Sequence, residues 1–148
     1  MKLTLKNYEL IPMMEFLQKM ELPANESRPV VKFVKLLSEA LKDIQESQMA
    51  LIEQFGKRDD KGEIVLTEDG TDYLIDPDKS EDYEDHSKEL LNEEVVIEGG
   101  PFVKVIERLP AVLEKYDTKI SGKDALIYDR LLDEFEKDKE ELKNESSE

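Results

Sequence analysis

The sequence predicts a helix-dominated α+β domain, and three observations lead to this fold class. Apolar residues recur at steps of three and four over residues 27–55 and again over residues 125–135, the spacing of amphipathic helices. Apolar and polar residues alternate over residues 2–6, as in a half-buried strand. The 148 residues of the chain are the usual size of one domain. We therefore expect a single α+β domain over residues 1–135, with one long central helix at about 27–55, a C-terminal helix and a small antiparallel sheet.

The first residues predict a short strand and then a helix. Leu3 and Leu5 form the apolar side of the strand, and Asn7 offers a side-chain oxygen that can cap the following helix. That helix carries an apolar stripe made of Leu10, Met13, Met14, Leu17 and Met20. Methionines in such a stripe either pack in a core or line an adaptable binding surface. Pro23 ends the helix.

The longest apolar stripe predicts the central helix. Ser27 is its expected N-cap, Pro29 is tolerated in its first turn, and Gly56 stands where a left-handed residue ends a helix. The stripe consists of Val30, Val34, Leu37, Leu41, Ile44, Leu51 and Phe55. About 28 residues give roughly 42 Å of helix, which is too long for a compact core alone to cover. The stripe needs a long partner helix, so pairing with the helices at 10–20 and 125–135 and homo-oligomer formation through the long helix are both open.

The middle of the chain predicts a hairpin and an exposed helix. Residues 63–66 and 73–75 are β-like runs around an Asp-Gly turn, and the N-terminal strand can join this hairpin. Asp76 then caps a polar helix that continues to about Asn92 with few apolar anchors. Residues 95–97 form a third β-like run.

The C-terminal part of the chain is predicted to be mainly helical. Residues 102–106 fit either a fourth strand or the start of a helix, and Pro110 suits the first turn of a short helix. Ser121 begins a sequence that resembles a capping box before the final helix. Apolar residues nearly vanish after Phe135, so residues 136–148 are expected to be an acidic tail that frays.

Acidic residues are concentrated in one segment. The chain has 37 Asp and Glu against 21 Lys and Arg, a formal charge of −16. Residues 59–98 hold 16 of these acids and three lysines, a net charge of −13. We interpret this segment as an acidic insertion in the domain, made of a hairpin and a helix. It is either a solvated region that keeps the protein soluble or a face for a basic protein partner.

Charge and hydropathy exclude several functions. A strongly negative chain is unsuited to the phosphate backbone, so we expect no direct nucleic-acid binding. No apolar run is long enough to span a bilayer, so we expect no membrane insertion, and Met1–Lys6 lacks the apolar core of a secretory signal. The absence of cysteine excludes disulfides and thiolate catalysis.

Seven acidic residues of this segment form the candidate partner-binding face: Asp72, Asp76, Asp78, Glu81, Asp82, Glu84 and Asp85. The simplest occupant is a basic protein. The alternative is that the carboxylates imitate the phosphate row of DNA or RNA and occupy a nucleic-acid-binding protein. Both hypotheses predict binding that weakens as salt is added.

No group of residues predicts catalysis, a metal site or a cofactor. His86 is the only histidine, and we expect it to be a polar residue on an exposed helix. Residues 76–80 imitate the start of a calcium loop, but Glu81 replaces the required glycine and Ser87 replaces the final glutamate. We therefore expect a protein that is not an enzyme, with a carboxylate-metal enzyme as the weakest alternative.

Several stretches resemble a family of small phage and prophage proteins of unknown function, the DUF1617 family. They are Leu3-Thr4-Leu5-Lys6-Asn7, Phe16-Leu17-Gln18-Lys19-Met20, Lys32-Phe33-Val34-Lys35-Leu36-Leu37 and Ile120-Ser121-Gly122-Lys123-Asp124-Ala125. The resemblance implies a phage of Gram-positive bacteria or its prophage, and it brings no activity and no site residues. It favours a protein–protein interaction module, either a virion accessory protein or an inhibitor of a host or host-defence protein. The expected location is the host cytoplasm or the virion.

Overall fold

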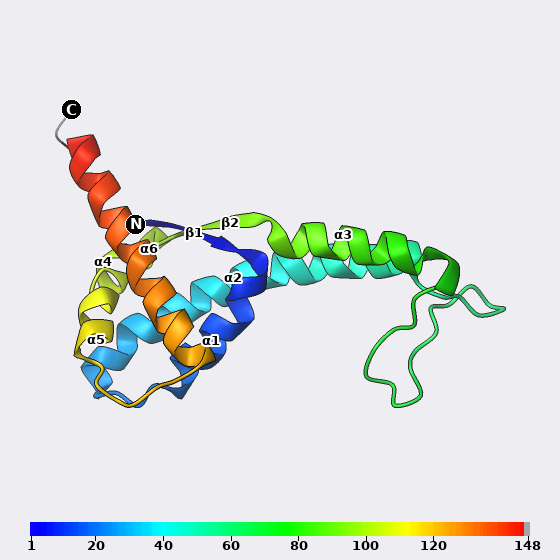
Figure 1. The fold of residues 1–148 in the computed structure, drawn as a ribbon, viewed down its shortest axis with the longest axis horizontal. Coiled ribbons are helices and arrows are strands. Elements are labelled where there is room, and N and C mark those ends of the chain that lie inside the picture. Colours follow the sequence, from blue (N-terminus) through cyan, green and yellow to red (C-terminus); the bar gives the residue numbers. More distant parts are fainter. Residues whose placement is uncertain (147–148) are drawn as a thin grey trace.

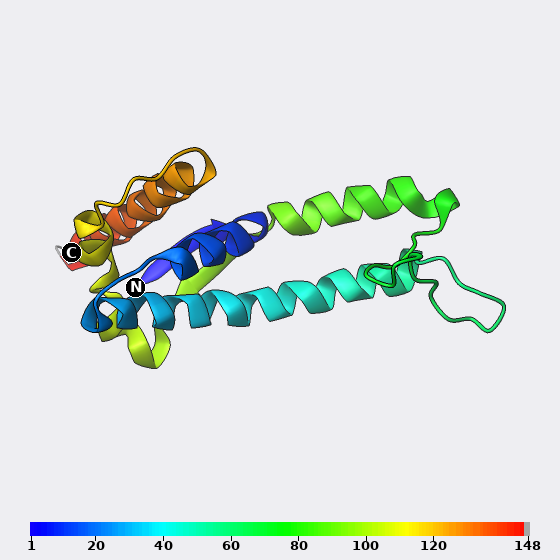
Figure 2. The same cartoon turned by 90° about the horizontal axis from the view of Figure 1, so that it is seen from below.

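The structure is a computed structural model that describes residues 1–146. The chain forms a body, residues 1–44 and 93–146, and an arm, residues 45–92, that projects from it (Figures 1 and 2). The elements up to the end of the arm are β1 (Lys2–Lys6), η1 (Asn7–Glu9), α1 (Leu10–Lys19), α2 (Ala24–Phe55), η2 (Pro77–Lys79) and α3 (Ser80–Asn92). Those that follow are β2 (Glu94–Glu98), η3 (Gly100–Phe102), α4 (Val103–Ile106), α5 (Leu109–Lys115) and α6 (Lys123–Ser146). The α+β class, the long central helix and the C-terminal helix are confirmed.

The sheet contains β1 and β2, paired antiparallel with Leu3 opposite Ile97 and Leu5 opposite Val95. The prediction that β1 joins a hairpin at residues 63–75 is therefore wrong. Leu3, Leu5 and Ile97 are buried and give the sheet one apolar face on the core. The predicted hairpin has no comparable buried face, because it lies on the arm and Leu66 is 48% exposed.

The core of the body lies between the sheet and the helices. Fully buried side chains come from every part of the body and include Leu3, Leu10, Phe16, Phe33, Leu37, Ile106, Leu113 and Leu131. Met13 is buried in this core, and Met14 and Met20 pack against it. The methionine stripe of α1 is therefore part of the core.

Helix α2 begins three residues before the predicted start. Its N-cap is Pro23, and the Ser27 hydroxyl donates to the Ala24 carbonyl inside the first turn, so Ser27 is not the cap. Gly56 ends the helix in an extended conformation with a φ of −67°, not in the left-handed region. Glycine fits there because a Cβ atom would lie 2.6 Å from the Ile52 carbonyl oxygen.

The apolar stripe of α2 is covered by helices of the same chain. Its first half packs on α1, α4 and α5, and its second half packs on α3. The Phe33 ring contacts the Phe135 ring of α6, with 5.7 Å between centroids. The intramolecular pairing considered above is thus present, and α3 supplies the additional partner for the distal half of the helix.

The segment between α2 and β2 follows the predicted order. Asp76 accepts a hydrogen bond from the backbone N–H of Asp78 at 3.0 Å, and α3 ends at Asn92. Residues 63–66 and 73–75 are not regular strands but make isolated bridges, including Leu66 opposite Tyr73.

The structure shows which alternative is correct for residues 102–106. Residues 103–106 are helical, and Pro110 lies in the first turn of α5. Helix α6 continues to Ser146, beyond the point where the apolar stripe ends, and the Asp138 carboxylate accepts a hydrogen bond from the Lys2 backbone. The final two residues of the predicted tail, 147–148, lie outside the described residues.

Candidate functional site

Phe55 is the packing centre of the arm. Its side chain is buried, and its ring lies 6.3 Å from the Tyr83 ring and 5.4 Å from the His86 ring, centroid to centroid. The His86 ring stacks on Phe55, and its Nδ1 atom is 4.0 Å from a Glu89 carboxylate oxygen. The single histidine is thus a packing residue on the exposed helix α3.

Asn7 ties the root of the arm to the body. It does not cap α1 as predicted, because it lies in η1 and its side-chain Nδ2 donates to the Leu90 carbonyl at 2.8 Å. Its backbone N–H donates to the Glu93 carbonyl at 3.0 Å. These two bonds hold the last turn of α3 against the first residues of the body.

The loop between α2 and α3 is held by its own backbone. Lys57 donates to the Leu74 carbonyl, Leu74 donates to the Val65 carbonyl, and Val65 donates to the Lys57 carbonyl, all within 2.9 Å. The Asp69 carboxylate accepts from both hydroxyls of Thr67 and Thr71, and these bonds lower its pKa to about 2. The tip of the arm is therefore an ordered loop in the structure.

The structure places six of the seven predicted acidic residues on one continuous segment, from Asp76 to Asp85. Asp72 is separate, because it lies in the loop and accepts a hydrogen bond from the Tyr73 backbone. Asp76 is half-buried as the cap of η2, and the other five are exposed on η2 and the first turns of α3. Within the described residues none of the seven makes a salt bridge.

Some of these acidic residues stabilise helix α3 itself. Glu81 and Asp82 lie in the first turn of α3, where unpaired N–H groups and the positive end of the helix dipole favour carboxylates. Glu84 and Asp85 lie further along the helix, where this effect fades. Asp76 caps η2 and Asp78 lies in its first turn. Of the six acids from Asp76 to Asp85, only Glu84 and Asp85 therefore lie outside a helix start.

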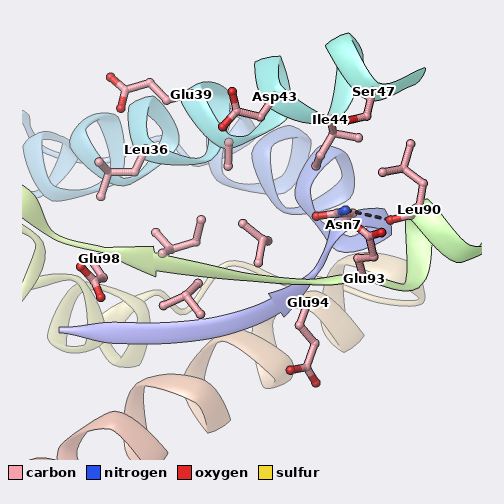
Figure 3. Close-up of a pocket in the computed structure, with 14 residues that line it drawn as sticks. Asn7, Leu36, Glu39, Asp43, Ile44, Ser47, Leu90, Glu93, Glu94 and Glu98 are labelled. Carbon is pink, nitrogen blue, oxygen red and sulfur yellow. Dashed lines mark hydrogen bonds between the residues drawn. The ribbon is translucent and has the colours of Figure 1, made fainter. Parts of the chain in front are cut away.

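A groove of about 430 Å³ lies where the arm meets the body, between α2 and β2 (Figure 3). Leu36, Ala40 and Ile44 of α2 form its apolar part, while Glu39 and Asp43 stand at its rim. The opposite wall is β2 with its flanking Glu93. Sequence reasoning missed this groove, although the spacing of residues 36, 40 and 44 on one helix face was a visible signal.

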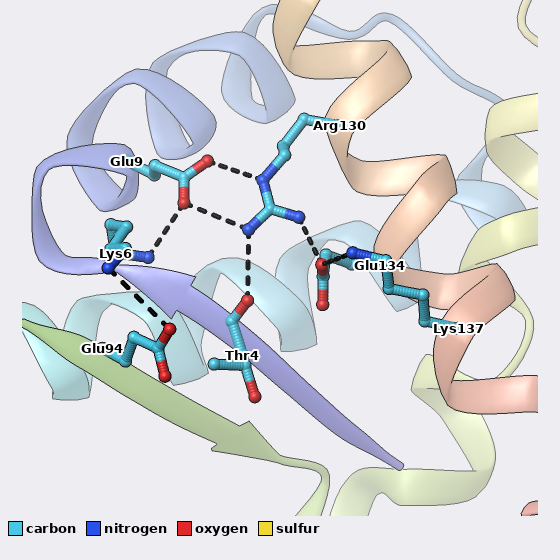
Figure 4. Close-up of polar contacts among 7 residues, drawn as sticks. All are labelled: Thr4, Lys6, Glu9, Glu94, Arg130, Glu134 and Lys137. Atoms are coloured by element: carbon cyan, nitrogen blue, oxygen red, sulfur yellow. Dashed lines mark hydrogen bonds and ion pairs between the residues drawn. The ribbon is translucent and has the colours of Figure 1, made fainter. Parts of the chain in front are cut away.

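Sequence reasoning also missed an ion-pair network in the body (Figure 4). Arg130 bonds to Glu9 at 2.9 Å, to Glu134 and to the Thr4 carbonyl at 3.2 Å, and Lys137 adds a further bond to Glu134. Burial alone would raise the pKa of Glu134, but the hydrogen bonds and charges of Arg130 and Lys137 lower it overall. Burial alone would likewise lower the pKa of Arg130, but its carboxylate partners raise it.

The network joins β1, η1 and α6, so its role is structural. The only local signal in the sequence was the spacing of four residues between Arg130 and Glu134. Glu9 is more than a hundred residues away in the chain and could not be assigned from spacing.

Residues 1–146 lack two further kinds of feature. No group of three or more His, Cys, Asp or Glu side chains in this range is arranged to hold a metal ion. No helix in the same range combines the length and the apolar character needed to cross a membrane.

The fold and the site define a small α+β protein with an acidic two-helix arm. A family model for DUF1617, described as a protein of unknown function, matches residues 1–142. The chain therefore belongs to the DUF1617 family, as its sequence resemblance indicated. Comparisons with curated proteins and with solved structures returned no match.

Proposed function

We propose that this protein is a phage-encoded, non-enzymatic protein–protein interaction module whose arm binds a basic partner protein. The observation that carries the proposal is a row of exposed acids: Asp78 in η2 and Glu81, Asp82, Glu84 and Asp85 in α3. None of them makes a salt bridge inside the described chain. These carboxylates sit on a helix that is fixed by Phe55 and Asn7.

A fixed array of like charges favours association with a cationic surface. Carboxylates on neighbouring turns of one helix repel each other, and this repulsion destabilises the free arm. A basic partner relieves the repulsion and adds attraction within the Debye length of about 8 Å at physiological salt. The backbone that carries most of the array is already helical in the free chain, so little backbone conformational entropy is lost on the side of this protein.

The phage origin rests on the family resemblance of the sequence. Within that setting, a protein of this size acts either as a virion accessory protein or as an inhibitor of a host or host-defence protein. The inhibitor role places it in the host cytoplasm, and the accessory role places it in the particle. Co-sedimentation with purified virions separates the two, because an inhibitor stays in the soluble fraction of infected cells.

The test uses two variants with the same charge change as baits in a bacterial host lysate, each beside the wild type. The arm variant carries Asp78→Asn, Glu81→Gln, Asp82→Asn and Asp85→Asn. The control variant carries Asp133→Asn, Glu136→Gln, Glu140→Gln and Glu141→Gln on exposed positions of α6. We expect the arm variant to lose a partner that the control retains, and the wild type to lose it at high salt. Equal capture by all three baits would contradict the proposal.

A second candidate function is mimicry of a nucleic acid. It is favoured by the spacing of four acids. Asp78 in η2 lies three and four residues before Glu81 and Asp82 of α3, and Asp85 lies four and three residues after them. If the arm imitates a phosphate row, duplex DNA competes with it for the captured partner. A partner that binds this protein and DNA at the same time would exclude mimicry and leave the general interaction role.

A further inference from the structure

We propose that the groove between α2 and β2 binds an extended segment of a partner protein as an added β-strand, with apolar and basic residues alternating along it. The inference rests on the proposed interaction role but assigns it a second surface, separate from the acids of α3.

The register of the sheet fixes which backbone groups point outward. In an antiparallel pair, the backbone N–H and C=O groups of successive residues point alternately toward the partner strand and away from it. The Asn7 N–H donates to the Glu93 carbonyl, so this pair is a hydrogen-bonded one. By the same alternation, the backbone of Leu5 bonds to that of Val95, and the backbone of Leu3 bonds to that of Ile97. The remaining positions of β2 therefore direct their N–H and C=O groups to its free edge: Glu94, Val96 and Glu98.

The outward backbone groups have hydrogen-bond partners on one edge of the sheet but not on the other. On the outer edge of β1, the Lys2 N–H donates to Asp138 at 2.9 Å and the Lys6 N–H donates to Glu9 at 2.8 Å. The Thr4 carbonyl on the same edge accepts from Arg130. On β2, none of the outward groups is bonded to α2 or to any other element of the described chain. An open strand edge of this kind is a template for another strand.

The groove beside this edge has the dimensions of a short strand. The wall of α2 runs from Leu36 to Ser47, about 16 Å at a rise of about 1.5 Å per residue. Five extended residues cover roughly the same length at about 3.3 Å each. Leu36 and Ile44 extend from α2 toward the strand and offer an apolar floor for alternate side chains of the incoming segment (Figure 3).

The charge of the rim indicates a cationic segment. Glu39 and Asp43 on one side and Glu93 and Glu98 on the other are exposed and without a salt bridge in the described chain, and no Lys, Arg or His lines the groove. Glu94 differs, because its carboxylate lies 3.8 Å from the Lys6 ammonium. Basic side chains turned away from the floor would reach the rim acids.

The same charges disfavour a second copy of this chain as the occupant. If two copies of β2 paired antiparallel about Val96, Glu94 of one would lie opposite Glu98 of the other on the same face. Like charges directly opposite each other destabilise a strand pair. The occupant that fits is therefore a different protein with basic residues.

The experiment follows backbone amide exchange of the full chain by NMR with a short peptide of alternating lysine and valine. We expect the amides of Glu94, Val96 and Glu98 to become protected on binding, since they acquire acceptors. The amides of Val95 and Ile97 already bond to β1 and should not change. A peptide in which glutamate replaces lysine should not bind. Absence of protection at the three edge amides, or protection of α3 instead, would overturn the proposal.

A matched pair of variants tests the edge itself. Val96→Pro removes an N–H that points outward, which is tolerated on a strand edge, whereas Val96→Thr keeps that N–H and the branched shape. We expect Val96→Pro to weaken peptide binding at least about tenfold and Val96→Thr by less than about twofold. Equal binding by both would overturn strand addition, as would a dimer of the wild type that Val96→Pro dissolves. The exchange measurement on the wild type decides the question if Val96→Pro does not fold.

The arm variant described above separates this inference from the proposed function. If both are correct, the arm variant loses the lysate partner but retains the peptide, and Glu39→Gln with Asp43→Asn weakens the peptide by several-fold. If only the groove inference is wrong, Val96→Pro binds the peptide with unchanged affinity. If only the proposed role of the arm is wrong, the arm variant captures the same lysate partner as the wild type.

Discussion

Acidic side chains of the body and of the arm have different surroundings. In the body, Glu134 is 7% exposed and bonds to Arg130 and Lys137, so its charge links secondary structure elements. In the arm, Glu81 and Asp85 are exposed and have no salt bridge within the described chain. The comparison shows that a buried acid of the body is used to join elements of the fold, whereas these acids of the arm have no such role within the described chain.

The two regions also differ in packing. The body buries whole side chains from the sheet and from helices on several sides. The arm has two helices packed along one line, with Phe55 as its main buried residue. Because local stability follows the density of buried apolar contacts, we expect the arm to open at a lower free energy than the body.

The largest effect is expected from the core of the body. Phe33 is fully buried against Phe135, so Phe33→Ala should lower the free energy of unfolding by about 3–5 kcal/mol through lost transfer energy and the cavity it leaves. Urea denaturation measures the change. Val31→Ala on the same helix is the control, because Val31 is 60% exposed and its loss should cost less than about 0.5 kcal/mol. Equal effects would show that the body has no specific core here.

The ion-pair network should give the next effect. Arg130→Met leaves Glu134 buried without its main partner, and we expect a loss of about 2–3 kcal/mol. Adding Glu134→Leu removes the uncompensated charge and should restore most of this loss. Thermal or urea unfolding of the two variants measures the difference, and a double variant as unstable as the single one would contradict the role assigned to the network.

Glu134 also predicts a pH dependence. Its pKa in the folded protein is below the ordinary value of 4.5, so its contribution to stability is complete above that pH. The contribution is lost as the pH falls through the folded pKa, because protonation then favours the unfolded chain. Urea unfolding between pH 6 and pH 3 should show a steeper loss for the wild type than for the double variant Arg130→Met with Glu134→Leu.

A local effect is expected in the arm. Phe55→Ala removes the ring that contacts Tyr83 and His86, so α3 should detach without unfolding the body. Native-state hydrogen exchange should show the α3 amides exchanging at least about tenfold faster, with body amides unchanged. Leu66→Ala in the loop is the control, since Leu66 is largely exposed. If exchange accelerates equally in the body, the two regions unfold as one unit.

The smallest effect is expected at the tip of the arm. Asp69→Asn weakens the bonds to Thr67 and Thr71 but touches nothing in the body, so the global free energy of unfolding should change by less than about 0.5 kcal/mol. NMR titration of the wild type should place the Asp69 carboxyl midpoint at about pH 2. A midpoint at the ordinary value would show that the loop bonds are not formed in solution.

Elements with dense local signals could be predicted from the sequence. The stripe from Val30 to Phe55 defined α2, the Asp76 cap defined the start of the segment leading to α3, and the alternation of Leu3 and Leu5 defined β1. Each of these depends on residues a few positions apart, where periodicity and capping chemistry act.

Features that depend on distant residues could not be predicted. The partner of β1 is set by which strand can complete a buried face, and Asn7 is used for Leu90 instead of capping its own helix. The acids of the arm were identified as one segment, but their exposure depends on how α3 packs on Phe55. The groove combines residues 36–47 with residues 93–98, which only the tertiary fold brings together.

Helix α2 passes without interruption from the body into the arm over residues 24–55, about 48 Å at the usual rise. A continuous helix of this length sets a fixed distance between its two ends. Whatever attaches to the far tip is held at a set distance and in a set direction from the core of this protein. Shortening α2 and α3 together by whole turns would therefore reposition a molecule bound at the proposed acidic face by a known step.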